Sequence, residues 1–254
     1  MNEVPVDACE HVASRLRLVG DEVHLWWGRR DAVESLDTLR GSLSEDERRR
    51  SERFRRERDA HAFAFRRAFL RATLAGHLGC RPRDIGFTLG EFGKPTLANP
   101  CADVCFSAAG TGDWALVAVS AGRELGADVE GDALTLDARL GEAEELSRLA
   151  RSVLTDSEQA ELACLAQSER ARAFLGAWTR KEALLKALGT GLSREPRTVE
   201  VGLAPLVAPR VLGPTLFPTD GAWLFDLAAP RGLVASLVVV ARKGERPHLR
   251  PHGL

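Results

Sequence analysis

The chain has 254 residues, of which 44% are hydrophobic and 28% are charged, and its formal net charge is −1. This length allows one large domain or two of ordinary size, and the composition is that of a soluble globular protein. The charge balance provides no global field for nucleic acid or membranes, and the longest apolar run, residues 233–241, is too short to span a bilayer.

The five cysteines are scattered along the chain and show no pairing pattern. Reduced thiols in a cytoplasmic protein are the simplest explanation, and the acidic, polar N-terminus does not resemble a signal peptide. Cys101 and Cys105 are spaced like possible metal ligands, but no second His or Cys pair completes such a site. We therefore expect a cytoplasmic protein without a thiolate metal centre.

The first 79 residues predict a strand followed by a long helical region. The strand covers residues 23–27. Ser44 and Glu47 have the spacing of a capping box, in which each side chain can bond the backbone N–H of the other and start a helix. The helical pattern continues to Gly79, a residue suited to the left-handed conformation that ends many helices.

The next part of the chain predicts loops and then strands. Residues 80–103 are rich in loop-forming residues, and β-type runs follow at residues 104–107, 114–120 and 125–130. Because only a short Ala-Gly-Arg-Glu turn separates the last two runs, we expect them to form a hairpin.

The second half of the chain repeats this plan. A second capping box precedes a helical region, and strands are predicted at residues 222–227 and 233–240. An offset of 110 or 111 residues pairs Ser44 with Thr155, Glu47 with Glu158, and Gly79 with Gly189. We therefore predict an α+β fold, a pseudo-twofold duplication of a helix-plus-antiparallel-sheet unit whose two halves pack as one monomer.

We expect three segments from this pattern. The N-terminal half occupies residues 1–122 and the C-terminal half occupies residues 123–242. Residues 243–254 are expected to be a frayed, flexible tail.

The stretch Trp178-Thr-Arg-Lys-Glu-Ala-Leu-Leu-Lys186 predicts a helix with two distinct faces. Trp178, Glu182 and Lys186 recur at intervals of four, so their side chains share one face. The other side carries an apolar stripe suited to a core: Ala177, Leu184 and Leu188. A polar ridge of this kind is often only the solvated face of a helix.

The polar ridge belongs to the second half alone. Under the same offset, Glu182 corresponds to Ala72 and Lys186 corresponds to Gly76. A duplicated fold with polar chemistry on one copy predicts a single site per chain, at the seam between the halves.

Asp128 and Glu130 supply a second acidic feature. They lie two apart in a strand run, so their side chains point to the same face, where two like charges repel unless a cation or a proton lies between them. Glu182 becomes a third carboxylate if the helix packs against that strand. Oxygen ligands without His or Cys suit Mg²⁺, whereas the alternative is a solvated strand end.

Basic residues crowd the first long helical region: Arg48, Arg49, Arg50, Arg53, Arg55, Arg56 and Arg58. Acidic residues are interleaved with them, so most are expected to be solvated. A subset that faces the seam would bind phosphate, because guanidinium groups fork onto phosphate oxygens. Lys94, between Gly93 and Pro95, is a further candidate for a phosphate contact.

Taken together, these residues resemble the 4′-phosphopantetheinyl transferases of the surfactin-synthetase-activating (Sfp) type, over residues 43–192. Gly126-Ala-Asp128-Val-Glu130 is similar to the Gly-Ile-Asp-Ile-Glu motif of that family, and the 178–186 stretch is similar to its Trp-Ser-x-Lys-Glu-x-x-x-Lys motif. Gly93-Lys94-Pro95 and Asp59-Ala60-His61 are similar to two further signatures, in the expected order.

The resemblance implies a set of roles. Asp128, Glu130 and Glu182 would hold Mg²⁺, or Mn²⁺ in its place, against the pyrophosphate of coenzyme A. Glu182 would also help to deprotonate a serine of an acyl- or peptidyl-carrier protein, and Lys186 would stabilise charge on the leaving 3′,5′-ADP. Further residues of this sequence are expected to bind coenzyme A: Arg48, Arg50, Lys94, Pro95 and Ser107. No nucleic acid or membrane is expected as a partner, and the family fold is a monomer.

One position departs from the family pattern. The family usually has Phe-Asn-Ile/Leu-Ser-His-Ser ahead of the acidic motif, and its histidine contacts a phosphate of coenzyme A. Here only Ser107 is kept, and Ala108 replaces the histidine. Losing one charge-assisted contact costs about 1.5–3 kcal/mol, so the resemblance implies weaker use of coenzyme A, or an arginine such as Arg123 in the same role.

Two other classes of function stay open. A non-catalytic relative would bind coenzyme A or a carrier protein without transfer, and Ala108 is the feature that favours it. A homologue with a different pyrophosphate donor would use an altered loop at residues 107–113. A purely structural scaffold is disfavoured, because it gives no reason for three carboxylates on one copy of a duplicated fold.

Overall fold

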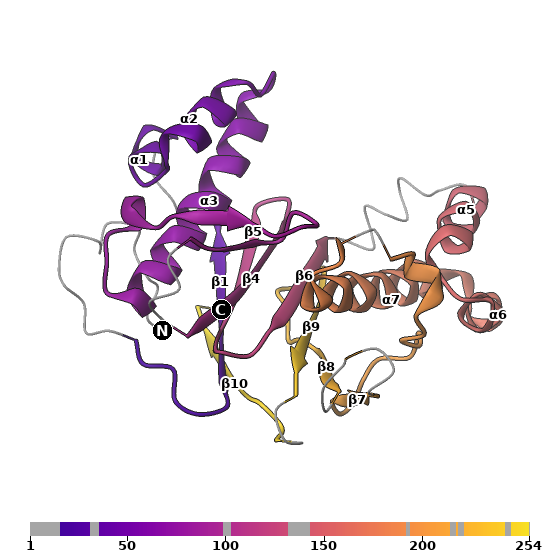
Figure 1. Cartoon of the computed structure of the whole chain (residues 1–254). Coiled ribbons are helices and arrows are strands. Elements are labelled where there is room, and N and C mark those ends of the chain that lie inside the picture. The colour runs from indigo at the N-terminus through magenta and orange to yellow at the C-terminus, as the bar shows by residue number, and fades with distance from the viewer. Residues whose placement is uncertain are drawn as a thin grey trace. The chain divides into compact units, whose positions relative to one another are not determined.

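The structure is a computed structural model, which describes residues 16–30, 36–98, 103–131, 143–191, 194–213, 217, 221–241 and 245–253. The chain forms two compact units, the first from residues 1–88, 95–122 and 248–254, and the second from residues 89–94 and 123–247. Each unit combines a four-stranded sheet with a 22-residue helix (Figure 1). Across the described ranges, no helix has the length and apolar character needed to cross a membrane.

The sheet of the first unit has the strand order β10-β1-β5-β4. Its strands are β1 (Glu22–Arg29), β4 (Val104–Thr111), β5 (Trp114–Ala121) and β10 (His248–His252), and its helices are α1 (Leu36–Gly41), α2 (Glu45–Glu52) and α3 (Glu57–Leu78). A 3-10 turn, η3 (Pro82–Asp84), follows α3, and β2 (Phe87–Leu89) pairs with β3 (Pro95–Leu97). Leu70 and Leu74 of α3 pack with Val117 and Val119 of β5 in the core.

The sheet of the second unit has the order β6-β9-β8-β7, with every pairing antiparallel. Its strands are β6 (Leu125–Gly131), β7 (Arg210–Leu212), β8 (Ala222–Asp226) and β9 (Leu233–Val240). Its helices are α5 (Ala143–Val153), α6 (Asp156–Cys164) and α7 (Gln167–Leu188), and a 3-10 turn, η5 (Pro196–Thr198), follows α7. Leu184 of α7 is fully buried in a core that includes Leu224 and Val238 of the sheet.

The two units repeat one plan. In the first, β1 pairs with β5 and β5 pairs with β4; in the second, β6 pairs with β9 and β9 pairs with β8, and all four pairings are antiparallel. Both predicted capping boxes are present, one before α2 and one before α6: Ser44 with Glu47, and Thr155 with Glu158. The predicted α+β fold of two similar halves is therefore confirmed.

The predicted hairpin between residues 114–120 and 125–130 is wrong. β5 is the partner of β1 and β4, whereas β6 pairs with β9 in a different sheet. Both edges of β5 are already occupied, so the short turn after it cannot fold β6 back onto it. Gly122 (φ 57°) instead leads the chain out of the first unit.

The predicted flexible tail contains a strand. β10 pairs in parallel with β1, with Glu22 opposite His248, and Arg250 donates from Nε to Glu22 Oε1 at 2.9 Å. The ring of His252 stacks on Trp26, with ring centroids 4.1 Å apart and planes 10° apart. Pro251 is tolerated because β10 lies at the edge of its sheet.

Three histidine rings of the first unit gather beside Trp26. The centroid of His24 lies 5.2 Å from that of His77 and 4.9 Å from that of His252. Burial lowers the pKa of His77 to about 4, against a hydrogen bond to the Leu16 carbonyl that favours the proton, and charge on His24 or His252 lowers it further. Burial also lowers the pKa of His252. The rings of His77 and His252 are therefore favoured in their neutral forms.

Acid should weaken the first unit through this cluster. The pKa of His77 falls from 6.5 in the unfolded chain to about 4 in the folded protein. Its contribution to the free energy of unfolding is therefore present above pH 6.5 and is lost as the pH falls toward 4. The free energy of unfolding should drop by up to about 3 kcal/mol over that window. Urea titrations between those pH values measure it.

His77→Gln should flatten this pH dependence, because the amide keeps a polar group near Leu16 without titrating. His248, whose side chain is 74% exposed, provides the matched control, and His248→Gln should keep the parental slope. An unchanged slope in His77→Gln would contradict the assignment.

Candidate active site

Helix α7 lies directly against strand β6 in the second unit (Figure 1). Their backbones meet at Gly126, where an added Cβ would lie 2.0 Å from the carbonyl oxygen of Ala183 and 2.4 Å from the amide nitrogen of Ala187. Only a glycine allows so close an approach. Glu182 joins the β6 carboxylates only if the helix packs on this strand, and the structure meets this condition.

Two side chains of the polar helix face contact the acidic strand. Trp178 donates from Nε1 to Glu130 Oε1 at 3.2 Å. Lys186 donates from Nζ to Asp128 Oδ1 at 2.7 Å and to the carbonyl oxygen of Ala127 at 3.1 Å. The ridge at 178, 182 and 186 is therefore turned toward β6 rather than simply solvated.

Two of the three carboxylates have raised pKa values. Burial raises the pKa of Glu130, and the negative charges of Asp128 and Glu182 raise it further, against the hydrogen bond from Trp178. Burial also raises the pKa of Glu182, where Lys186 opposes the rise and Asp128 adds to it. Clustered like charges of this kind cost stability, and such sites are candidates for function.

Asp128 has an oxygen that can accept a cation. The residue is 6% exposed, and its Oδ2 is buried without a hydrogen-bond partner, while Oδ1 accepts from Lys186. A buried unsatisfied oxygen is costly. Among the described residues, no three His, Cys, Asp or Glu side chains are arranged as a ready metal cluster. The donors still fit Mg²⁺, which binds through one or two carboxylates and takes other oxygens from water and phosphates.

Lys94 belongs to the same unit and lies near the start of β6. Its Nζ donates to Glu124 Oε2 at 2.6 Å and to the carbonyl oxygen of Leu125 at 3.2 Å. Lys186 binds the carbonyl two residues further along, at Ala127. Two ammonium groups therefore line β6, which is an edge strand of its sheet.

The remaining predicted coenzyme A contacts lie in the first unit. Arg48 donates from Nε to the carbonyl oxygen of Arg40 at 3.0 Å, and the Arg50 guanidinium lies 5.2 Å from the ring centroid of Phe63. Pro95 begins β3, and Ser107 is buried in β4. Their contacts to coenzyme A stay predictions.

The structure argues against Arg123 as a replacement for the missing histidine. Its side chain is 4% exposed, and its guanidinium donates to the carbonyl oxygen and to Oε2 of Glu245, both at 3.2 Å. Ala108 itself lies opposite Val117 and packs against the apolar core that contains Phe106. An alanine therefore satisfies its surroundings without a polar partner.

Sequence reasoning missed the contacts on the other sides of α7. Thr179 hydrogen-bonds Ser236 of β9 at 2.9 Å. Arg180 donates to both carboxylate oxygens of Asp226 in β8, at 2.8 and 2.6 Å. Lys181 pairs with Glu158 at 2.6 Å. The sequence contained one signal for these contacts, namely three consecutive polar residues on a helix that is otherwise packed in a core.

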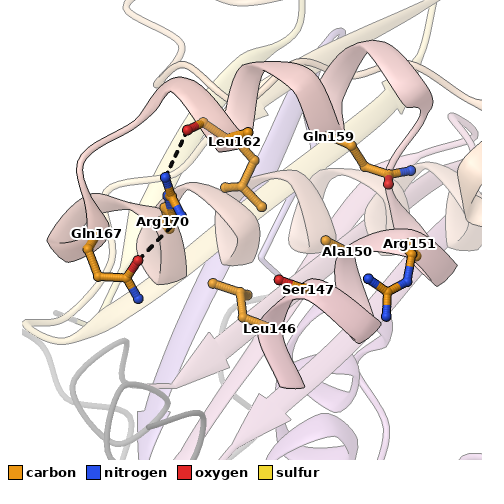
Figure 2. Close-up of a pocket in the computed structure, with 9 residues that line it drawn as sticks. Leu146, Ser147, Ala150, Arg151, Gln159, Leu162, Gln167 and Arg170 are labelled. Atoms are coloured by element: carbon orange, nitrogen blue, oxygen red, sulfur yellow. Dashed lines mark hydrogen bonds between the residues drawn. The ribbon is translucent and has the colours of Figure 1, made fainter. Parts of the chain in front are cut away.

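A recess of about 250 Å³ lies between α5, α6 and the start of α7 (Figure 2). Its lining combines apolar and polar side chains: Leu146, Ser147, Ala150, Arg151, Gln159, Leu162, Ala163, Gln167 and Arg170. Arg170 bridges α6 and α7, donating to the carbonyl oxygens of Ala163 at 2.8 Å and Leu165 at 3.0 Å. None of the predicted site residues lines it, so the recess is separate from the carboxylates on β6.

Comparisons with known proteins agree on one family. Residues 124–238, which include β6 and α7, match the family described as the 4′-phosphopantetheinyl transferase superfamily. The chain is 33% identical over 236 residues to the 4′-phosphopantetheinyl transferase HetI of a Nostoc strain, covering 91% of this chain and 93% of that protein. It is 35% identical over 152 residues to the putative 4′-phosphopantetheinyl transferase slr0495 of a Synechocystis strain, covering 59% and 58%. It is 24% identical over 152 residues to the 4′-phosphopantetheinyl transferase Sfp of Bacillus subtilis, covering 59% and 62%.

Proposed function

This chain belongs to the 4′-phosphopantetheinyl transferase superfamily, and from that premise we propose how its β6 carboxylates and the polar face of α7 carry the reaction. The enzyme transfers the 4′-phosphopantetheine group of coenzyme A to carrier proteins. The acceptor is a serine hydroxyl of an acyl- or peptidyl-carrier protein. Its oxygen bonds to the β-phosphorus of coenzyme A, the bond from that phosphorus to the bridging oxygen breaks, and 3′,5′-ADP leaves.

One observation carries the proposal: the α7 face with Glu182 and Lys186 packs on the strand that bears Asp128 and Glu130. The three carboxylates would hold Mg²⁺, or Mn²⁺ in its place, with further oxygens from water and phosphate, and the buried, unpartnered Oδ2 of Asp128 supports this. When bound, the cation supplies charge that neutralises the pyrophosphate of coenzyme A.

Glu182 takes the proton of the carrier serine. Burial raises its pKa toward neutrality, and a general base works best when its pKa approaches the working pH. Lys186, held against Asp128 and the Ala127 carbonyl, stabilises the negative charge that develops on the leaving 3′,5′-ADP.

Other cations position the donor. Lys94 contacts a phosphate of coenzyme A, supported by its place beside β6 in the second unit. The first half, residues 1–122, supplies the remaining contacts through Arg48, Arg50, Pro95 and Ser107, and residues 123–242 supply the carboxylates and the catalytic helix.

We further propose that the enzyme is of the surfactin-synthetase-activating type and works as a monomer in the cytoplasm. The duplicated fold within one chain supports the type, although the identity to Sfp, 24%, is lower than the 33% identity to HetI. The exposed free thiols of Cys80 and Cys164 suit a reducing compartment. The carriers served are those of polyketide, nonribosomal peptide or fatty acid synthesis.

Purified protein incubated with Mg²⁺, coenzyme A and an apo carrier should add a phosphopantetheine group to the carrier, as measured by intact-protein mass. A carrier whose acceptor serine is replaced by alanine is the control and should gain no mass. If no carrier from several classes is modified while calorimetry shows coenzyme A binding, the protein is a non-catalytic relative. If a different pyrophosphate donor alone supports the reaction, the donor assignment is wrong.

A further inference from the structure

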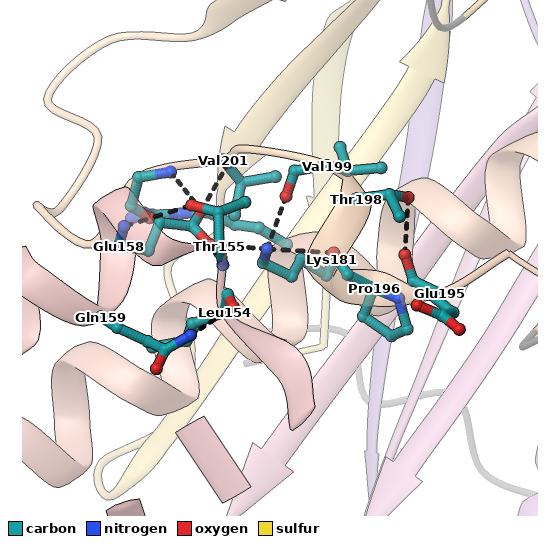
Figure 3. A network of polar contacts seen from close by, with 12 residues as sticks. Leu154, Thr155, Glu158, Gln159, Lys181, Glu195, Pro196, Thr198, Val199 and Val201 are labelled. Carbon is teal, nitrogen blue, oxygen red and sulfur yellow. Dashed lines mark hydrogen bonds and ion pairs between the residues drawn. The ribbon is translucent and has the colours of Figure 1, made fainter. Parts of the chain in front are cut away.

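Lys181 precedes Glu182 in the sequence, yet the partners of its side chain are not the carboxylates on β6. The residue is 1% exposed, and its Nζ has three oxygen partners (Figure 3). These are the Glu158 carboxylate at 2.6 Å and the carbonyl oxygens of Val199 at 2.5 Å and Pro196 at 3.1 Å. An ammonium group has three donors, so all of them are used inside the protein and none is left for a substrate.

Glu158 is equally embedded. Its Oε2 accepts the backbone N–H of Thr155 at 2.9 Å, which closes the capping box of α6. Its Oε1 accepts the backbone N–H groups of Val201 at 2.7 Å and Gly202 at 3.0 Å. The ion pair therefore joins the start of α6, the segment 196–202 and the middle of α7.

The first unit contains the same arrangement. Arg71 of α3 donates from Nε to Glu47, the capping-box glutamate of α2, at 2.7 Å. Its Nη1 donates to the carbonyl oxygens of Pro82 at 2.9 Å and Ile85 at 2.8 Å, at the 3-10 turn η3. Lys181 uses the equivalent atoms at η5, and the repeat offset aligns Arg71 with Lys181.

Only in the second unit is the anchored residue followed along the helix by residues of the predicted site. Successive residues of an α-helix are about 100° apart around its axis, so anchoring Lys181 on one side fixes the direction in which Glu182 projects. Glu182 and Lys186 lie on the face toward β6. In the first unit, the residues aligned with them are Ala72 and Gly76, which carry no such chemistry.

We propose that Lys181 is a positioning residue for phosphopantetheine transfer. This inference rests on the proposed function of Glu182 and Lys186. Through Glu158 and the two carbonyls at η5, Lys181 sets the rotation of α7 about its axis, and so sets where the carboxylate of Glu182 and the ammonium of Lys186 lie relative to Asp128. Lys181 itself contacts neither substrate nor cation.

Two substitutions at this position give opposite expectations. Lys181→Met keeps the length of the side chain but removes its three donors, so α7 loses this anchor and can shift. The value of kcat should fall by roughly 10²-fold, because a displacement of about 1 Å in a site has that effect. The Kd for coenzyme A should change far less. Lys181→Arg should restore most of kcat, because Arg71 satisfies the same set of acceptors in the first unit.

Arg71→Met is the matched control, because it removes the equivalent ion pair from the unit without the carboxylates. It should lower Tm while kcat of the folded enzyme stays near the parental value. Rates are measured well below each Tm, with the folded fraction determined by circular dichroism. Glu158→Gln weakens the same ion pair without changing α7, so it serves as a second test if Lys181→Met does not fold. It should lower kcat with little change in the Kd for coenzyme A.

Parental kcat in folded Lys181→Met, or in Glu158→Gln when the first variant does not fold, would overturn the proposal and leave the pair with a purely stabilising role. A folded Lys181→Arg as slow as Lys181→Met would also overturn it, in favour of direct chemistry by the ammonium group. An inactive parent enzyme is a different result, since it contradicts the proposed function before any variant is compared.

Discussion

Glu182→Ala is expected to abolish phosphopantetheine transfer, lowering its rate by roughly 10²–10⁴-fold, the range typical for loss of a general base, and further if a metal ligand is lost as well. The fold should survive. Glu182 is only half-buried, and burial together with the charge of Asp128 raises its pKa, so its ionised form is disfavoured where it lies. Removing it relieves repulsion within the cluster, and Tm should be unchanged or higher.

Initial rates measured by carrier mass, with Tm measured on the same samples, check this result. Glu182→Gln separates charge from shape, because it keeps the volume of the side chain and should be nearly as slow. Glu161→Ala removes an exposed carboxylate from α6 of the same unit and should keep the parental rate. Retained transfer in Glu182→Ala would remove this residue from both the base and the cation assignments.

The parts of the site that were predictable from sequence depend on local spacing. Trp178 and Lys186 share a helix face because of the 3.6-residue period, and both contact β6. The capping boxes are visible because their partners are three residues apart. The charge on Asp128 acts on Glu182 only because α7 packs on β6, and spacing alone left that packing as a condition.

What could not be predicted depends on distant pairing. Lys181 and Glu158 are 23 positions apart, and no local pattern in the sequence distinguishes a buried lysine from a solvated one. The hairpin prediction failed because β5 takes its partners from β1 and β4 instead of the next strand in the chain. β10 is short and polar, so its sequence lacks the hydrophobic alternation that would have predicted a strand paired with β1.

Gly126→Ala is expected to damage stability and transfer together. The added Cβ would lie 2.0 Å from the Ala183 carbonyl oxygen, 2.4 Å from the Ala187 amide nitrogen and 2.8 Å from Lys186 Cβ. Two of these neighbours are backbone atoms of α7, so no rotamer change relieves the overlap and the helix must move away from β6. Overpacking of this kind costs about 1–3 kcal/mol or more.

The loss of activity should exceed what the loss of stability explains. Moving α7 lengthens the contact between Lys186 and Asp128 and the contact between Trp178 and Glu130, because both cross the surface that Gly126 holds together. A displacement of about 1 Å should lower kcat by roughly 10²-fold in the molecules that remain folded. Urea unfolding and transfer rates on the same preparation separate the two effects.

Gly213→Ala is the matched control, since an added Cβ there meets no atom within 4 Å and the backbone is not left-handed. It should change neither the free energy of unfolding nor the rate of transfer.

If Gly126→Ala folds and transfers like the parent, the close approach of α7 to β6 is not what places Glu182 and Lys186. If it folds with normal stability but is slow, the glycine serves the geometry of the site more than the packing of the core. The expected joint loss would mean that one backbone contact both holds the second unit together and positions its carboxylates, so a residue without a side chain would be as necessary to the chemistry as the acids two and four positions after it.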